Sequence, residues 1–411
     1  MRQLSYLKKL LDGIEVEWKV IDELASLRRG RVMSKGYFID NIGEYPVYSS
    51  QTANNGEIGS IDTFDFDGEF VSWTTDGANA GTVFYRTGRF SITNVCGLIK
   101  INSEIPLNYK YLFYWLTIEA KKHVYSGMGN PKLMSHQVGK IPVPIPCPNN
   151  PKKSLAIQSE IVRILDKFTA LTAELTAELT AELTTRKKQY NYYRDRLLSF
   201  KEGEVEWKTL GDVTKKWYSG GTPTAGNPEY YVNGKIPWLR TQEVKFTDIS
   251  ATDVKITEAA LKNSSAKWIP KNCVIIAISG ATAGRSAINK IPLTTNQHCG
   301  CLEIDSKKAL YRYVFHWVSF NYESIKVLGQ GARGDLNSTI IKNFKLPIPY
   351  ATNPEKSLQE QAKIVAVLDK FDALTNSISE GLPREIELRQ KQYEYYRDLL
   401  FNFPKPKPVT N

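Results

Sequence analysis

The chain has 411 residues and a formal net charge of +11 at pH 7, from 54 lysines and arginines against 43 acidic residues. Its apolar and charged fractions are those of a soluble globular protein, and no apolar stretch is long enough to span a bilayer. We therefore expect a cytoplasmic protein without membrane contact. The basic charge favours phosphate backbones as partners, although a basic protein can also carry its charge for solubility alone.

The residue types that catalysis needs are scarce or scattered. The five cysteines are an odd number without CxxC spacing, which indicates neither a disulfide framework nor a common zinc site. We interpret His298, Cys299 and Cys301 as part of a core strand. The chain also lacks the Pro-Pro dipeptide of amino-methyltransferase loops, a P-loop and an HExxH motif. We expect no catalytic residue, no metal and no cofactor in this chain.

Residues 1–150 are predicted to form a globular unit of mixed α/β class. The runs GTVFYR at 81–86 and CGLIKI at 96–101 have the composition of strands. The small-residue loop GANAG at 77–81 either brings backbone close to another surface or is only a tight turn. Side chains of the types that read bases or fix phosphates lie around it. The candidates for DNA contact in this unit are Trp73, Thr74, Thr75, Asn79, Arg86 and Arg89.

A long helix is predicted at residues 151–201. Its apolar residues recur at three- and four-residue intervals, as in Ile157, Ile161, Leu165 and Phe168. Three TAEL tetrads at 172–183 continue the helix with strong helix formers. The tetrads keep three leucines near the same face, at Leu175, Leu179 and Leu183. The whole helix is expected to be roughly 70 Å long.

Residues 202–350 are predicted to form a second mixed α/β unit, followed by a second long helix at 351–403 and a tail at 404–411. This unit has a strand-like run, CVIIAIS at 273–279, and a loop, GATAG at 280–284. Its candidates for DNA contact are Arg240, Thr241, Gln242, Arg285 and Asn289. In the second helix Gly381 and Pro383 should kink or split the chain, because proline lacks a backbone donor.

The second half of the chain repeats the first. IVRILDKFTALT at 161–172 returns as IVAVLDKFDALT at 364–375, and RKKQYNYYRDRLLSF at 186–200 returns as RQKQYEYYRDLLFNF at 389–403. Both displacements are 203 residues, and GANAG and GATAG are also 203 residues apart. The helices match closely, while the globular units share only short segments. This pattern predicts one frame that carries two different binding faces.

Each long helix has an apolar stripe that needs a partner. Because the two stripes match, the simplest arrangement pairs the helices with each other, and two similar repeats close most readily with two-fold symmetry. We therefore predict two globular domains joined by two antiparallel helices that form a coiled-coil-like spacer. The alternative is two unrelated helices that each pack on their own domain.

The chain resembles the DNA-specificity subunits of type I restriction-modification systems, and among them the type IC branch. The resemblance rests on the TAEL tract, on the two repeated helical segments, on GLPREIELRQKQYEYYRDLL and on domain openings such as GEVEWKTLGDV with SGGTP and IPWL. It covers essentially the whole chain. It implies that residues 1–150 and 202–350 are target-recognition domains that read a bipartite, asymmetric site in double-stranded DNA.

The resemblance also implies partners. Two modification subunits would bring S-adenosylmethionine and adenine methylation, and restriction subunits would bring ATP, magnesium, translocation and cleavage. The candidates for contact with these partners lie on the repeated helices, at Tyr192, Arg194, Tyr395 and Arg397. Two alternatives stay open: a free-standing bipartite DNA-binding regulator, and a coiled-coil scaffold that binds only protein.

Overall fold

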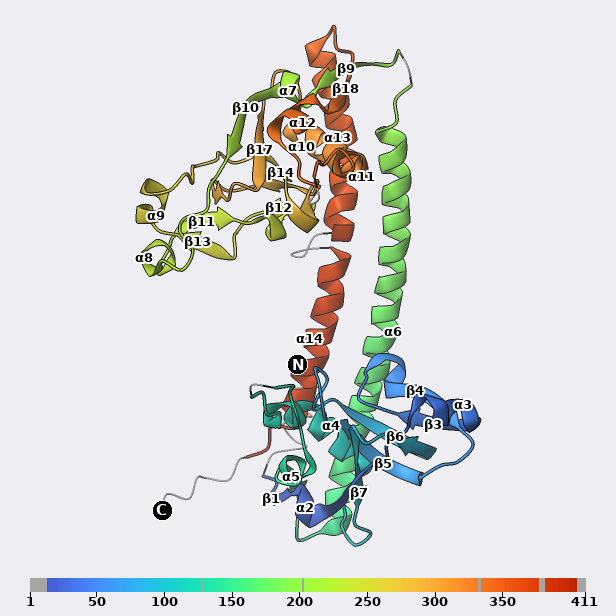
Figure 1. Cartoon of the computed structure of the whole chain (residues 1–411). Coiled ribbons are helices and arrows are strands. Elements are labelled where there is room, and N and C mark those ends of the chain that lie inside the picture. The colour runs from blue at the N-terminus through green and yellow to red at the C-terminus, as the bar shows by residue number, and fades with distance from the viewer. Residues whose placement is uncertain (1–12, 128, 202, 332–333, 377–380, 405–411) are drawn as a thin grey trace. The chain divides into compact units, whose positions relative to one another are not determined.

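The computed structural model describes residues 13–127, 129–201, 203–331, 334–376 and 381–404. These residues belong to two compact units (Figure 1). The first unit comprises residues 1–176 and 388–411, and the second comprises residues 177–387. Each unit holds one globular domain together with segments of the long helices. No helix in the described part of the chain is long and apolar enough to cross a membrane.

The first domain contains a six-stranded sheet in the order β2-β7-β5-β6-β3-β4 and a two-stranded sheet of β1 and β8. Neighbouring strands are antiparallel, except that β3 runs parallel to β6. The strands are β1 (Val16–Val20), β2 (Ala25–Arg29), β3 (Ile42–Tyr48), β4 (Glu57–Ile61), β5 (Phe66–Thr74), β6 (Val83–Ile92), β7 (Cys96–Ile101) and β8 (Pro142–Pro146). The helices are α2 (Ile21–Leu24), α3 (Lys35–Asp40), η1 (Ala53–Gly56), α4 (Tyr109–Glu119), η2 (Ala120–His123) and α5 (Ser135–Val138).

The second domain contains a five-stranded sheet, β10-β17-β14-β15-β12, a three-stranded sheet, β13-β11-β16, and a pair, β18-β9. The strands are β9 (Val205–Thr209), β10 (Thr214–Ser219), β11 (Ile236–Leu239), β12 (Asp248–Ile249), β13 (Val254–Ile256), β14 (Val274–Ala277), β15 (Ser286–Asn289), β16 (Thr294–Thr295), β17 (Cys299–Ile304) and β18 (Lys345–Pro349). The helices are α7 (Leu210–Val213), α8 (Pro228–Tyr231), η3 (Thr241–Glu243), α9 (Glu258–Lys262), η4 (Gly280–Thr282), α10 (Tyr311–Phe320), α11 (Tyr322–Lys326) and α12 (Ser338–Asn343).

The central strands of both domains are buried on both faces. In β14, Val274 and Ile276 belong to the core that includes α10, whereas Ile275 and Ala277 belong to a second, smaller core. Alternate side chains of a strand point to opposite faces, so a run that serves two cores is apolar throughout. Cys299 and Cys301 are buried in β17, as predicted, but the prediction was wrong for His298, which is exposed and precedes the strand.

The helices that leave the two domains contain the repeated segments. They are α6 (Pro151–Leu197), α13 (Pro354–Asn376) and α14 (Leu382–Leu400). The unit boundary lies inside α6, between Thr176 and Ala177, and inside α14, between Glu387 and Leu388. Residues 377–380 lie outside the described residues, and Pro383 stands in the first turn of α14. Of the tail predicted at 404–411, the structure describes only Pro404.

Within each unit the long helices pair through aromatic side chains. In the first unit Phe168 stacks on Tyr396 with ring centroids 5.2 Å apart, and Thr169 Oγ1 donates to the Tyr393 hydroxyl at 3.2 Å. The second unit repeats the stack 203 residues away, with Phe371 on Tyr193 at 5.5 Å. In the first unit, higher numbers on α6 meet lower numbers on α14. The predicted antiparallel pairing of the helices is therefore confirmed.

A buried glutamine on each long helix joins it to the preceding domain. Gln158 Oε1 on α6 accepts from the backbone N–H of Asn108, just before α4, at 2.8 Å. Gln361 Oε1 on α13 accepts from the backbone N–H of Leu310, just before α10, at 2.9 Å. Both glutamines are fully buried, and each also donates to a serine four residues earlier on its helix. The domain–helix junction is thus built twice with the same hydrogen bonds.

An aspartate strengthens each junction with different partners. Asp166 on α6 accepts from Lys110 Nζ and from the Tyr114 hydroxyl, each at 2.7 Å. Asp369 on α13 accepts from Arg312 Nη2 and His316 Nε2, each at 2.6 Å. Burial raises the pKa of Asp369, but the hydrogen bonds from His316 and Arg312 outweigh it and hold the pKa below its ordinary value.

Replacing Asp369 with Asn should lower the free energy of unfolding of the second unit by about 2 kcal/mol at neutral pH, since it removes the carboxylate that pairs with His316 and one of those that pair with Arg312, which keeps Asp248. The pKa of Asp369 is lowered on folding, so its stabilisation is present above the unfolded pKa of roughly 3.9 and is lost as the pH falls further. The difference between wild type and Asp369→Asn, measured by urea unfolding, should therefore shrink in acid.

The matched control is Glu360→Gln on the same helix, where Glu360 pairs with the exposed Lys363. An exposed pair of this kind contributes about 0.5 kcal/mol or less. Equal losses in the two variants would show that Asp369 does not hold the second domain on α13.

Candidate nucleic-acid interface

The two glycine loops have one backbone structure. Loop 75–82 joins β5 to β6, and loop 278–285 joins β14 to β15. In the first, the N–H of Gly81 bonds the carbonyl of Thr74 at 2.9 Å, and the N–H of Ala80 bonds that of Gly77 at 2.9 Å. In the second, the corresponding bonds are Gly284 to Ala277 at 2.8 Å and Ala283 to Gly280 at 3.0 Å. All of these positions are displaced by 203 residues.

The glycines of these loops have distinct tasks. Gly77, Gly81, Gly280 and Gly284 all have positive φ, between +71° and +87°, a region that other residues adopt at a cost. A Cβ on Gly77 or Gly280 would meet no atom within 4 Å, whereas one on Gly81 would lie 2.8 Å from Val124 Cγ2. The first glycine of each loop therefore forms an open tip, and the second seats the loop against the domain.

A second loop in each domain completes this edge, and it was not predicted from the sequence. The N–H of Leu133 bonds the carbonyl of Thr75 at 2.9 Å, and the N–H of Leu336 bonds that of Ile278 at 2.8 Å. Glycine-rich segments, SGMGNPKL at 126–133 and GQGARGDL at 329–336, precede these leucines at the same displacement. The glycine-rich composition of both segments and their common final leucine were the available signal, since no glycine falls at matching positions. Met128, Ala332 and Arg333 lie outside the described residues.

The side chains on the two frames differ in charge. In the first domain Asp76 lies 3.7 Å from Arg29 Nη2 and 3.9 Å from Lys132 Nζ. At the position of Lys132 the second domain has Asp335, whose Oδ1 accepts from the Gly280 N–H at 3.4 Å. Ser279, in place of Asp76, bonds His298 Nδ1 at 2.6 Å. The same backbone edge thus presents different donors and acceptors in the two domains.

Five of the residues predicted to contact DNA are buried, so we correct this part of the prediction: their side chains do not lie on a surface that a duplex could contact directly. Trp73 donates from Nε1 to the Leu133 carbonyl at 2.9 Å and lies against Gly97. These side chains lie in strands or strand ends that are enclosed on both faces, where a polar residue type says nothing about exposure. The buried residues are Trp73, Thr74, Thr75, Arg86 and Asn289.

The other predicted residues lie nearer the surface but not all at the loops. Asn79 belongs to the first loop, and its Nδ2 donates to the Ser50 carbonyl at 3.4 Å. Arg89 is exposed on β6 and pairs with Asp67 at 3.1 Å. Arg240 is held near Glu243 and Asp253, beside Thr241 and the exposed Gln242. Among the described residues, the half-buried Arg285 has no side-chain hydrogen bond or ion pair, so its guanidinium is available at the second loop.

The residues predicted for partner contact have similar surroundings in the two copies of the repeated helix. Tyr192 and Tyr395, which are 203 residues apart, are each 59% exposed. Arg194 and Arg397 instead pair with the next residue along the chain, at 2.7 and 2.8 Å. In the TAEL tract Leu175, Leu179 and Leu183 are half-buried, consistent with one face of α6.

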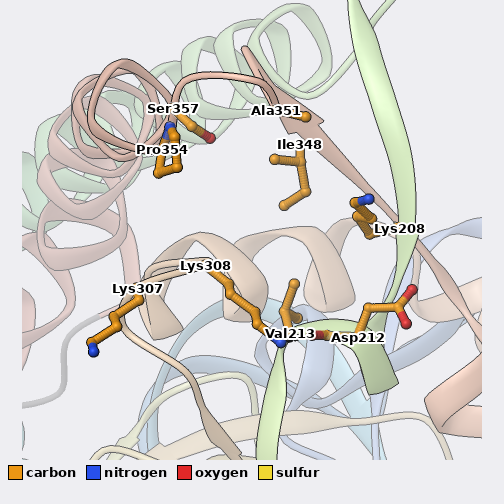
Figure 2. A pocket seen from close by; sticks show the side chains of 9 residues that line it. All are labelled: Lys208, Asp212, Val213, Lys307, Lys308, Ile348, Ala351, Pro354 and Ser357. Atoms are coloured by element: carbon orange, nitrogen blue, oxygen red, sulfur yellow. Dashed lines mark hydrogen bonds between the residues drawn. The ribbon is translucent and has the colours of Figure 1, made fainter.

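A basic pocket of about 400 Å³ lies elsewhere in the second unit, and Figure 2 shows the side chains that line it. Lys208, Lys307 and Lys308 supply its positive charge. Lys308 Nζ donates to the Asp212 carbonyl at 2.8 Å. In the first domain Glu104 stands 203 residues before Lys307, so the charge of Lys307 is not part of the repeat. None of the pocket's lining residues belongs to the glycine loops.

Comparisons with known proteins find the same family along nearly the whole chain. The family model described as "Type I restriction modification DNA specificity domain" matches residues 14–185 and 202–388. The type I restriction enzyme EcoR124I/EcoR124II specificity subunit of Escherichia coli is 42% identical over 429 residues, with 100% of both chains covered. A putative type I restriction enzyme specificity subunit of Haemophilus influenzae is 34% identical, covering 97% of this chain and 98% of that protein.

A solved structure supports the same fold. The S subunit of a type I restriction-modification system from M. genitalium superposes with a TM-score of 0.53 at 17% identity. The match covers 96% of this chain and 98% of that chain.

Replacing Gly81 with Ala should destabilise the first domain more than replacing Gly77 with Ala. Both glycines have a φ near +80°, so each change carries a left-handed penalty of about 1 to 2 kcal/mol. Only the Cβ at position 81 also meets Val124, which should add about 1 kcal/mol or more. Urea unfolding of the two variants measures the difference, and identical losses would show that Gly81 does not seat the loop.

Proposed function

The chain belongs to the family of type I restriction-modification DNA specificity subunits, and we propose that its two domains read two different half-sites of one double-stranded DNA target. It is the non-catalytic subunit that directs DNA sequence specificity. The target would then be bipartite and asymmetric, with unread base pairs between its halves. The net charge of +11 supports DNA as the ligand, since basic side chains neutralise its phosphates.

One observation carries this proposal: the two glycine loops share their backbone hydrogen bonds but not their side chains. Asn79 and Thr82 of the first loop correspond to Thr282 and Arg285 of the second. A shared frame presents each loop to a duplex in the same way, and different side chains then select different base edges. A palindromic target would require the same side chains in both domains.

Partner subunits supply the chemistry in this proposal. Two modification subunits would carry S-adenosylmethionine and the methyl-transfer site, and restriction subunits would carry ATP, magnesium and the cleavage site, in the cytoplasm. No group of three or more metal-binding side chains occurs among the described residues. Tyr192 and Tyr395 support two equivalent contacts, because each is a large exposed aromatic at the same position of a repeated helix.

Replacing Arg285 with Ala should lower affinity for the cognate site by about 10- to 100-fold, the contribution of one good base contact. The measurement is DNA binding and methylation by the variant assembled with its modification subunits, on duplexes with one or the other half-site scrambled. The loss should appear when the half-site of the second domain is intact and disappear when that half is scrambled.

The matched control is Lys215→Ala, which removes one positive charge from the same domain where Lys215 pairs with Glu303 at 2.9 Å. It should leave the preference between sequences unchanged. An equal loss for Arg285→Ala on every duplex would exclude Arg285 from base reading.

Deleting one TAEL tetrad, residues 176–179, should shorten the unread spacer by about one base pair and leave both half-sites unchanged. A tetrad adds about 6 Å of helix and turns it by about 40° beyond a full turn, close to the rotation of one base-pair step. Sequencing the methylated sites of a host that carries the altered subunit tests this. A tetrad of equal length but different composition is the control, and an unchanged spacer after the deletion would reduce the tract to helix filler.

A further inference from the structure

Arg86 on β6 and Asn289 on β15 occupy the same position of the repeat, 203 residues apart. Asn289 is fully buried and fully bonded. Its Oδ1 accepts from the Cys273 N–H at 2.9 Å, and its Nδ2 donates to the carbonyls of Pro270 and Ile291 at 2.7 and 2.9 Å. In the second domain this position is therefore a closed structural site.

The same position in the first domain is left open. Arg86 is 2% exposed, and its Nε donates to Ser72 Oγ at 3.0 Å. Its Nη1 and Nη2 have no hydrogen-bond partner among the described residues. Burial lowers the pKa of Arg86 to about 10, while Tyr48, Cys96 and Glu57 act in the opposite direction. At neutral pH the side chain is still charged.

An unpaired charge in the interior is unfavourable, and the surroundings of Arg86 offset only part of the cost. The guanidinium carbon lies 3.6 Å from the centre of the Tyr48 ring and 4.4 Å from that of Phe84. Such cation–π contacts are favourable, and more so when they are desolvated. Replacing a buried charge by an apolar side chain of similar length is often neutral or stabilising. Folding alone therefore gives no reason for an arginine here.

The segment above Arg86 is the loop between β3 and β4. A Cβ on Gly56 would lie 3.0 Å from Arg86 Nη2, so the guanidinium lies directly beneath this loop. Three successive residues, Asn54, Asn55 and Gly56, have positive φ of 47°, 54° and 83°. Residues 52–55 are exposed. Tight turns of this kind form concave backbone surfaces that bind anions.

The loop between β3 and β4 adjoins the first glycine loop. Asn79 of the first glycine loop donates from Nδ2 to the Ser50 carbonyl at 3.4 Å, which links the two loops. The N–H of Thr93 bonds the Tyr48 carbonyl at 2.9 Å and fixes the start of the β3–β4 loop against the sheet. An anion on residues 52–56 would lie beside Asn79.

We propose that residues 52–56 bind one phosphate of the DNA backbone, and that Arg86 is the positioning residue beneath them, supplying positive charge to the loop from the interior. The inference rests on the proposed function, since it places this phosphate next to the half-site of the first domain. In the low dielectric of the core the charge acts on the loop surface without being screened by solvent. The second domain has no equivalent, because Asn289 is neutral and its hydrogen bonds are complete.

The test is Arg86→Met in the full chain assembled with its modification subunits. Methionine keeps an apolar side chain on Tyr48 and removes the charge. Affinity for a cognate duplex, measured against salt concentration, should fall, and the slope of its logarithm against log salt should decrease by about one. The melting temperature should stay the same or rise. Arg86→Lys should restore the salt slope, because it returns the charge.

The matched control is Asn289→Leu, which should lower the melting temperature of the second unit and leave the salt slope unchanged. A lower melting temperature for Arg86→Met with an unchanged salt slope would make Arg86 a purely structural residue and overturn the proposal. A second result would also overturn the proposal. If inorganic phosphate stabilised the wild type but not Arg86→Met, while both had the same DNA salt slope, the site would bind a free anion and not a DNA phosphate.

The proposed function has its own readout. If the wild-type complex did not distinguish the cognate duplex from a scrambled one, the proposal that the two domains read two half-sites would be overturned, whatever the salt slope of Arg86→Met. If it did distinguish them and Arg86→Met kept the wild-type slope, only the phosphate site would be overturned.

Discussion

A hydrogen bond that a buried glutamine accepts from the backbone N–H just ahead of a domain helix fixes each globular domain on its long helix. Gln158 and Gln361 are closed off from solvent, and an unbonded amide there would destabilise the fold by about 1 to 3 kcal/mol. Each glutamine therefore fixes the distance between its long helix and the neighbouring backbone, at Asn108 or Leu310. The position of α4 or α10, and of the strands it covers, follows from that requirement. The position of the glycine loops, which join these strands, follows from it as well.

With the frame held by these bonds, side chains elsewhere are free to differ. Asp166 binds a lysine and a tyrosine of α4, whereas Asp369 binds an arginine and a histidine of α10, yet each holds the corresponding domain helix in place. At the loops, Asp76 lies between two cations while Ser279 bonds a histidine. Backbone bonds carry the geometry in both cases. Side-chain chemistry can then change from one domain to the other without moving the backbone of this edge.

The helices and their pairing could be predicted from the sequence, because a stripe such as Ile157 to Phe168 has one period and its repeat has the same one. The glycine loops were found because their glycines recur at one displacement. The exposure of Arg86 and Asn289 could not be predicted, since strands with a core on each face offer no polar side on which to place a polar residue. The loops before Leu133 and Leu336 escaped notice because only their glycine-rich composition and the final leucine are common to both. Tertiary contacts, not local pattern, decide these positions.

The duplicated junction also affects how domains can be exchanged by recombination. The residues that attach a domain to its helix, Ser154 and Gln158 in one copy and Ser357 and Gln361 in the other, are identical and equally spaced. A genetic crossover within the coding segment for either helix would therefore join a foreign domain to a junction that already fits it. The incoming domain would arrive in the right orientation without compensating mutations. New pairings of existing domains would then be reachable in a single recombination event.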